Sequence, residues 1–107
     1  MSLPKPPKAY DQFVERFPHL GKAWDEIHTQ GDATDLDEKT RRLIRIAASV
    51  GAGRMGAVRA GTRKARAMGI PRQEIEQVVA LAAGTIGIPA SVAAFCWMQD
   101  VFEAEQT

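Results

Sequence analysis

The chain has 107 residues, which suffices for one domain with a modest core and gives no reason to seek a second domain. Its formal net charge is +1, so no long-range field draws the whole molecule to nucleic acid or anionic lipid. A single cysteine excludes an intrachain disulfide and a multi-cysteine metal site, and it fits a reducing compartment. No apolar run follows the N-terminal lysines and no segment approaches the ~20 apolar residues of a membrane span, so we expect a soluble cytoplasmic protein.

Prolines and glycines indicate how the chain is divided. The three prolines near the N-terminus predict an extended lead-in over residues 1–7, followed by a single helical domain over residues 8–107. Apolar residues then recur at helical spacing, and no run alternates with the period of a strand. The sequence therefore predicts an all-α fold of five or six helices, over residues 8–17, 20–30, 36–50, 54–68, 71–87 and 89–105.

The third predicted helix has the clearest start. Asp35 is a good N-cap and Glu38 follows three residues later, which is a capping-box pattern. The buried stripe of this helix is predicted to contain Leu36, Leu43, Ala47 and Val50.

The fourth predicted helix lies in a basic stretch, because residues 51–69 contain five basic residues and no acidic one. At about 100° per residue, Arg59, Arg63 and Arg66 share one narrow sector of the helix. No aromatic residues interleave with them, so a solvated face is favoured over a nucleic-acid site. Arg54 falls in the opposite, inward sector, where an arginine needs a carboxylate or a ligand anion. The other residues of the inward sector are Ala57, Val58, Gly61, Ala65 and Met68.

The order and spacing of these segments resemble the carboxymuconolactone decarboxylase family, which includes the alkylhydroperoxidase D-like proteins. The resemblance covers residues 13–102. It implies an alkylhydroperoxidase D-like helical bundle that assembles as a homo-oligomer, either a trimer or a hexamer. The resemblance rests on four segments, which are "FPHLGKAWDEI", "LDEKTRRLIRIAASVGAG", "GAVRAGTRKARAMGIPRQEIEQVVALAA" and "GIPASVAAFCWMQDVF".

The reactive positions of that family are replaced in this chain. For the hydroperoxidase branch the resemblance implies Cys-x-x-Cys-x-x-x-His at the start of the fourth helix and a glutamate on the preceding helix. Arg54 and Ala57 stand at the cysteine positions, Gly61 at the histidine position and Arg42 at the glutamate position. These positions supply neither the low-pKa thiolate nor the resolving thiol of a dithiol peroxidase. In the decarboxylase branch, Cys96 sits where a histidine is common.

Three hypotheses for function follow from these replacements. The first is a carbon–carbon lyase or related protein that acts on or binds a small organic acid, with Arg42 and Arg54 holding its carboxylate. The second is a non-catalytic oligomeric binding or scaffold protein, a pseudoenzyme that kept the fold. The third is a degenerate alkylhydroperoxidase-like oxidoreductase of peroxiredoxin type. The predicted pocket residues are Arg42, Arg54, Ala57, Gly61, Met68 and Cys96.

The charges on Arg42 and Arg54 are permanent, so these side chains either pair within the chain or hold an anion. The conceivable internal partners are Asp25, Glu26 and Glu74. In the ligand interpretation, the small side chains at positions 57 and 61 leave room for the acid. No metal or cofactor is expected, because no His, Cys or carboxylate cluster has ligand spacing.

Several single residues receive structural rather than chemical predictions. Cys96 lies between Phe95 and Trp97, which favours a buried small side chain over a reactive thiol. His28 is interpreted as a surface or partly buried histidine and His19 as a turn residue. The aromatic residues Trp24, Phe13 and Phe17 are expected in the core or in a subunit contact.

Overall fold

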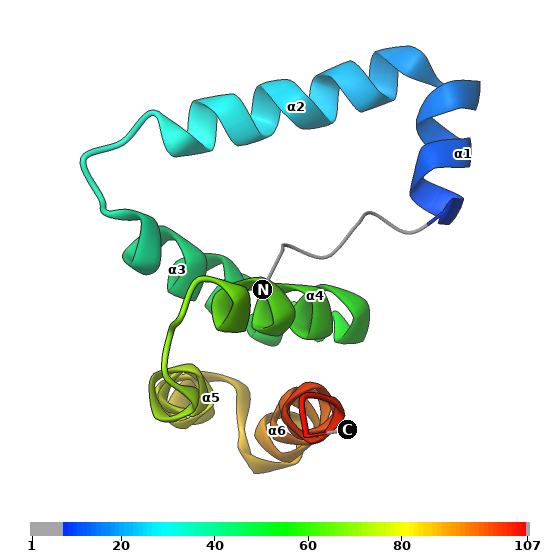
Figure 1. The fold of residues 1–107 in the computed structure, drawn as a ribbon. Helices are drawn as coiled ribbons and strands as arrows, with labels where there is room; N and C mark the ends of the chain where they lie inside the picture. Colours follow the sequence, from blue (N-terminus) through cyan, green and yellow to red (C-terminus); the bar gives the residue numbers. More distant parts are fainter. Residues whose placement is uncertain (1–7, 107) are drawn as a thin grey trace. The chain divides into compact units, whose positions relative to one another are not determined.

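Residues 8–106, which the computed structural model describes, form six α-helices and no strand (Figure 1). The prediction of an all-α fold is confirmed. None of these helices is both long enough and apolar enough to cross a membrane. The predicted lead-in over residues 1–7 lies outside the described residues. The helices are α1 (Lys8–Arg16), α2 (Pro18–Asp32), α3 (Glu38–Gly51), α4 (Met55–Ala67), α5 (Arg72–Ile86) and α6 (Ile88–Ala104).

The chain separates into two compact units. Among the described residues, the helix-pair unit covers residues 8–37 and contains α1 and α2. The four-helix unit begins at Glu38 and contains α3 to α6. The single domain over residues 8–107 stays a prediction.

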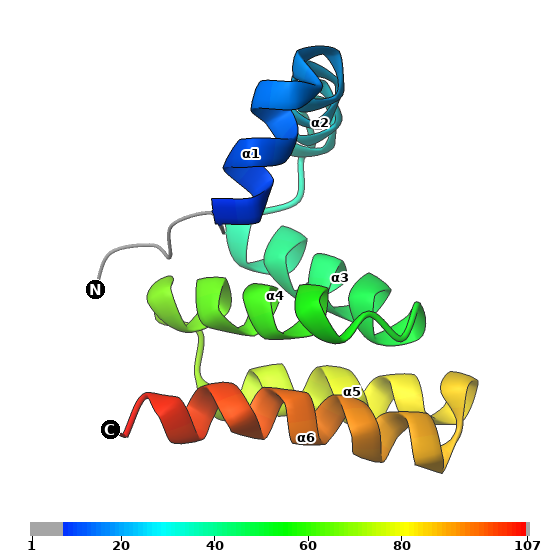
Figure 2. The same ribbon diagram turned by 90° about the vertical axis from the view of Figure 1, so that its right-hand side faces the viewer.

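The core of the four-helix unit draws on all four of its helices. The pair α3 and α4 forms one layer, and the pair α5 and α6 forms a second layer against it (Figures 1 and 2). Thr62 and Ser91 are the buried polar residues of this unit, and their hydroxyls donate to the Val58 carbonyl at 2.7 Å and the Gly87 carbonyl at 2.8 Å, which satisfies both groups. The largest fully buried side chains are Ile46, Val58, Thr62, Ile75 and Met98.

Helix α3 begins two residues later than the sequence predicts. Residues 33–36 form bends, so Asp35 is not the N-cap, and Leu36 lies outside the helix and is 47% exposed. Ala47 is also exposed, because it faces a surface groove. Ile46 instead lies in the core with no exposed area. The predicted stripe was therefore wrong at two positions and missed the main core residue of the helix.

The end of α4 agrees with the prediction. Gly69, which directly follows the predicted helix over residues 54–68, has φ of +84°, a left-handed conformation that glycine adopts without the steric cost of a Cβ. Pro71 directly precedes α5 as its N-cap, with the fixed φ that suits this position. The turn between the two layers is therefore encoded locally.

The helix-pair unit differs from its prediction at the α2 start. Helix α2 begins at Pro18, two residues before the predicted start at residue 20, and the first turn of a helix is a position that proline favours because its missing N–H has no intrahelical partner there. His19 is consequently helical, and its prediction as a turn residue was wrong. Phe13, Phe17 and Trp24 are 46%, 48% and 51% exposed, which contradicts a core position and leaves the subunit contact as the prediction.

Candidate functional site

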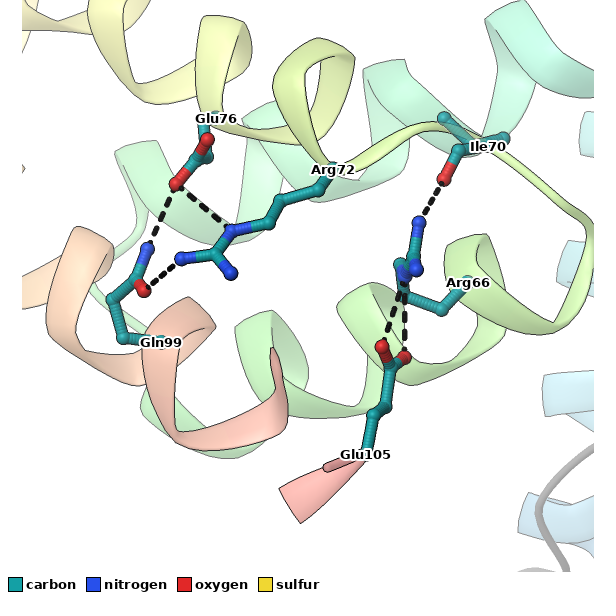
Figure 3. A network of polar contacts seen from close by, with 6 residues as sticks. All are labelled: Arg66, Ile70, Arg72, Glu76, Gln99 and Glu105. Carbon is teal, nitrogen blue, oxygen red and sulfur yellow. Dashed lines mark hydrogen bonds and ion pairs between the residues drawn. The ribbon is translucent and has the colours of Figure 1, made fainter. Parts of the chain in front are cut away.

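Two arginines of α4 are paired with carboxylates of α6. Arg59 Nη2 donates to Asp100 Oδ2 at 2.6 Å. Arg66 Nε lies 3.1 and 3.2 Å from the two carboxylate oxygens of Glu105, and its Nη1 donates to the Ile70 carbonyl at 3.0 Å (Figure 3). Two arginines of the sector predicted as a solvated face therefore connect α4 to α6, and the third, Arg63, is exposed.

Arg72 plays the same structural part between α5 and α6. Its Nη2 donates to Gln99 Oε1 at 2.6 Å, and Gln99 Nε2 donates to Glu76 Oε2 at 2.8 Å (Figure 3). The guanidinium also lies 4.7 Å from the centroid of the Phe102 ring. This network is satisfied by groups of the chain itself, so it is a poor candidate for a ligand site.

The predicted inward position of Arg54 was wrong. Arg54 is the N-cap of α4, with φ −96° and ψ 92°, so its side chain does not follow the helical spacing that assigned it to the inward sector. It is exposed, and Ala57 is exposed as well. Glu74, one of its conceivable partners, is paired with Lys39.

Gly61 is buried, but its small size does not leave room for a ligand. A Cβ at this position would lie 3.0 Å from Cγ1 of Ile46, so the space is already occupied by the core. Met68 is half-buried and packs against the same core. The interpretation that these small and apolar residues line an acid pocket is therefore not supported by their surroundings.

Cys96 is exposed, so its prediction as a buried side chain was wrong. Its neighbours Ala94 and Met98 have no exposed area, and a residue midway between them in a helix points to the opposite face. His28 is half-buried with Nδ1 3.0 Å from the Trp24 carbonyl oxygen, as its structural interpretation predicts.

A cluster of four cations lies where α3 packs against α4. Partial burial lowers the pKa of Lys64, and the positive charges of Arg42, Arg45 and Arg63 lower it further. Arg42 and Arg45 are three residues apart on α3 and share a face, whereas Arg63 and Lys64 are consecutive on α4. We call these four residues the cationic cluster. The sequence analysis selected Arg42 as a site residue but not the other three. The three-residue spacing of Arg42 and Arg45 is a signal that places both arginines on one face of a helix.

An apolar groove lies on another side of α3, between α3 and α5. Its volume is about 510 Å³. Ile44 and Leu81 stand at its surface with 51% and 74% of their areas exposed. None of the six predicted pocket residues lines it. The lining residues are Thr40, Leu43, Ile44, Ala47, Glu74, Gln77, Val78, Leu81 and Ala82.

No group of three or more His, Cys, Asp or Glu side chains within residues 8–106 is placed to hold a metal ion. The side chains of the cationic cluster have a chemistry of their own. Guanidinium groups bind carboxylates in bidentate fashion, and an ammonium group adds a compact charge or, when deprotonated, a nucleophilic amine.

Residues 18–100 match the sequence model of the carboxymuconolactone decarboxylase family. The chain belongs to this family. No curated protein and no solved structure matched the chain. The resemblance to the hydroperoxidase branch implies reactive groups at three positions of this fold. In this chain they are Arg54, an exposed N-cap, Ala57, which is exposed, and Gly61, which is closely packed.

Proposed function

We propose that this carboxymuconolactone decarboxylase family protein binds a small organic acid at the cationic cluster of α3 and α4. The observation that carries the proposal is the grouping of four cations on adjacent helices, with Arg42 and Arg45 one turn apart on α3 and Arg63 and Lys64 consecutive on α4. Burial lowers the pKa of Lys64, and the charges of the three arginines lower it further. Arg42 and Arg45 also have interactions within the chain. An anion bound among the four cations would add to that neutralisation and oppose their mutual repulsion. A ligand with two carboxylates is favoured, because it neutralises more of the cluster than a ligand with one.

The proposed roles follow from the chemistry of each side chain. Arg42 and Arg45 are half-buried on α3 and supply the planar donor fork that fits a carboxylate. Lys64 contributes a point charge from α4, and Arg63 contributes a second guanidinium charge from the same helix. Arg42 thus keeps the role that the sequence suggested, whereas Arg54 does not share it.

The test is a thermal-shift and calorimetric screen with small mono- and dicarboxylates. A ligand present at 100 times its dissociation constant stabilises the folded state by about 2.7 kcal/mol, a shift that is easily measured. Lys64→Met and Arg63→Gln are expected to lose this stabilisation. Arg54→Ala is the matched control, because it removes one exposed arginine of α4 outside the cluster. Failure of every acid to bind, or an equal loss in Arg54→Ala, would contradict the proposal.

A second candidate is binding without catalysis, as in a scaffold protein that has lost the reactive residues. The packing of Ile46 against Gly61 favours it, because that position has become part of the core. Release of carbon dioxide from the acids that bind distinguishes the two: turnover supports the lyase, and binding without turnover supports the non-catalytic protein. Hydroperoxide reduction coupled to a dithiol is expected to be negligible, since Cys96 stands alone in the chain.

A further inference from the structure

Lys64 lies on the side of α4 that faces α3. The two helices are joined by residues 52–54, pack against one another and run in opposite directions (Figure 2). They meet where a Cβ at Gly61 would lie 3.0 Å from Cγ1 of Ile46. Lys64 comes one turn after Gly61 on α4, and Arg42 comes one turn before Ile46 on α3. In an antiparallel pair both steps lead the same way along the interface, by about 4.5 and 6 Å, so the backbone places Arg42 opposite Lys64.

The charged side chains that act on the Lys64 amine are all cations. Partial burial lowers the pKa of this amine, and the charges of Arg42, Arg45 and Arg63 lower it further. A larger share of Lys64 is therefore neutral than of an ordinary lysine at the same pH, and a neutral amine is a nucleophile. The side chain is also exposed, so a small solute in water reaches it.

Carboxylates of the neighbouring helices pair with other cations. Glu74 of α5 forms an ion pair with Lys39 of α3. Asp100 and Glu105 of α6 pair with arginines that lie about 140–160° from Lys64 around α4. Lys39 and Lys64 are thus lysines in fields of opposite sign, the first beside an anion and the second among cations.

We propose that Lys64 is a carbamylation site, at which carbon dioxide adds reversibly to the side-chain amine. The lone pair of the neutral Nζ forms a bond to the carbon of carbon dioxide, and the electrons of one C=O π bond move to an oxygen. The nitrogen then releases a proton to water, which leaves a carbamate with one negative charge. The guanidinium groups favour this product twice, because they disfavour the unreactive ammonium form and stabilise the anion that replaces it.

The modification changes the charge of the whole cationic cluster. Four formal positive charges become three positive charges and one negative charge, so the total falls from +4 to +2. One consequence rests on the proposed function: an organic acid that binds the cluster should bind more weakly when carbon dioxide is present. The carbamate itself requires no bound acid, so an acid screen without a hit counts against the proposed function and not against the carbamate.

The first experiment equilibrates the full chain with isotope-labelled bicarbonate, which supplies labelled carbon dioxide. An oxonium alkylating reagent then converts carbamates to stable esters, and peptide mass spectrometry locates them. We expect more label on Lys64 than on Lys39, whose amine lies beside Glu74. Lys64→Arg should lose the label at this position while it keeps the positive charge, and Lys39→Arg, the matched control, should leave the labelling of Lys64 unchanged.

The decisive variant is Arg63→Gln, which removes one guanidinium group and leaves the amine in place. Labelling of Lys64 should fall on the order of threefold or more, since even a well-solvated charge at close range acts on this equilibrium. Arg54→Gln is the matched control, because Arg54 is the N-cap of α4 and lies outside the cluster. Arg54 and Arg63 are both exposed, so circular dichroism should show unchanged helix content. Absence of label on Lys64, equal labelling of Lys39 and Lys64, or equal effects of the two arginine variants would overturn the proposal.

Discussion

Gly61 is the position at which one added methyl group tests how α3 and α4 pack. In Gly61→Ala the new Cβ would lie 3.0 Å from Cγ1 of Ile46, closer than the roughly 3.5–4.0 Å at which carbon atoms attract. Ile46 is fully buried, and its Cγ1 is next to the branch point of the side chain rather than at a flexible tip. The substitution therefore forces either the two helices apart or Ile46 out of its preferred rotamer.

Two opposing terms set the size of the effect. Replacing glycine by alanine inside a helix stabilises a protein by about 0.5–1 kcal/mol. Overpacking a filled core costs about 1–3 kcal/mol. We expect the cost to win, with Gly61→Ala lowering the free energy of unfolding by about 0.5–2 kcal/mol, and each kcal/mol corresponds to roughly 4–8 °C in the melting temperature of a domain of this size.

The assay is urea denaturation followed by circular dichroism, with Gly84→Ala as the control. Gly84 lies in α5, and a Cβ there meets no atom within 4 Å, so this variant should gain the helix term alone. Ile46→Ala removes the crowded Cγ1, so in that background Gly61→Ala should become stabilising. A coupling of about 1–3 kcal/mol is expected in this double-mutant cycle. Equal stabilisation by Gly61→Ala and Gly84→Ala in the wild-type background would refute the packing argument.

The remaining predictions concern charged groups and the thiol. The pKa of Lys64 lies below 10.5 in the folded chain, so its contribution to stability is complete above pH 10.5 and is lost as the pH falls through the lowered value. The free energy of unfolding of the wild type, measured relative to Lys64→Met, should therefore rise with pH between the lowered pKa and 10.5. Parallel curves for the two proteins would contradict the assignment. Arg72→Ala, which removes the hydrogen bond to Gln99 and the contact with Phe102, should lower the free energy of unfolding by about 1–2 kcal/mol, whereas the exposed Arg54→Ala should stay within about 0.5 kcal/mol in the same denaturation assay. The exposed Cys96 should form an intermolecular disulfide under oxidation, visible on a non-reducing gel and absent in Cys96→Ser; failure to cross-link would indicate that another copy shields it.

Much of the helix order was predictable because its signals are local. Gly69 and Pro71 encode the turn between α4 and α5 through backbone geometry alone, and the structure agrees. The core face of α3 was less predictable, because Ile46 and Ala47 both fit a helical repeat that includes Leu43 and Val50. Which of the two residues faces inward depends on where α4 and α5 pack, and the spacing of apolar residues in α3 does not predict that.

The candidate site was less predictable because its geometry joins distant segments. Arg59 and Asp100 are 41 residues apart, so nothing in the basic stretch around Arg59 reveals that its charge is paired. The cationic cluster combines residues of two helices in the same way. Cys96 was misplaced for a different reason: its apolar neighbours in sequence suggested burial, but adjacent residues of a helix point in different directions.

The packing at Gly61 also bears on how this chain departs from the hydroperoxidase branch that it resembles. Arg54→Cys and Ala57→Cys change exposed positions, so a chain with both substitutions should fold with near wild-type stability and show two additional thiols in a thiol titration. Adding Gly61→His introduces a side chain where even a methyl group crowds Ile46, and it should cost several times the destabilisation of Gly61→Ala. Ile46→Ala in the same chain should recover part of that loss by vacating the space. If Gly61→His were tolerated while Ile46 is present, the helices would be less closely packed than the structure shows. Three substitutions would then be enough to restore the Cys-x-x-Cys-x-x-x-His motif, with no repacking of the core.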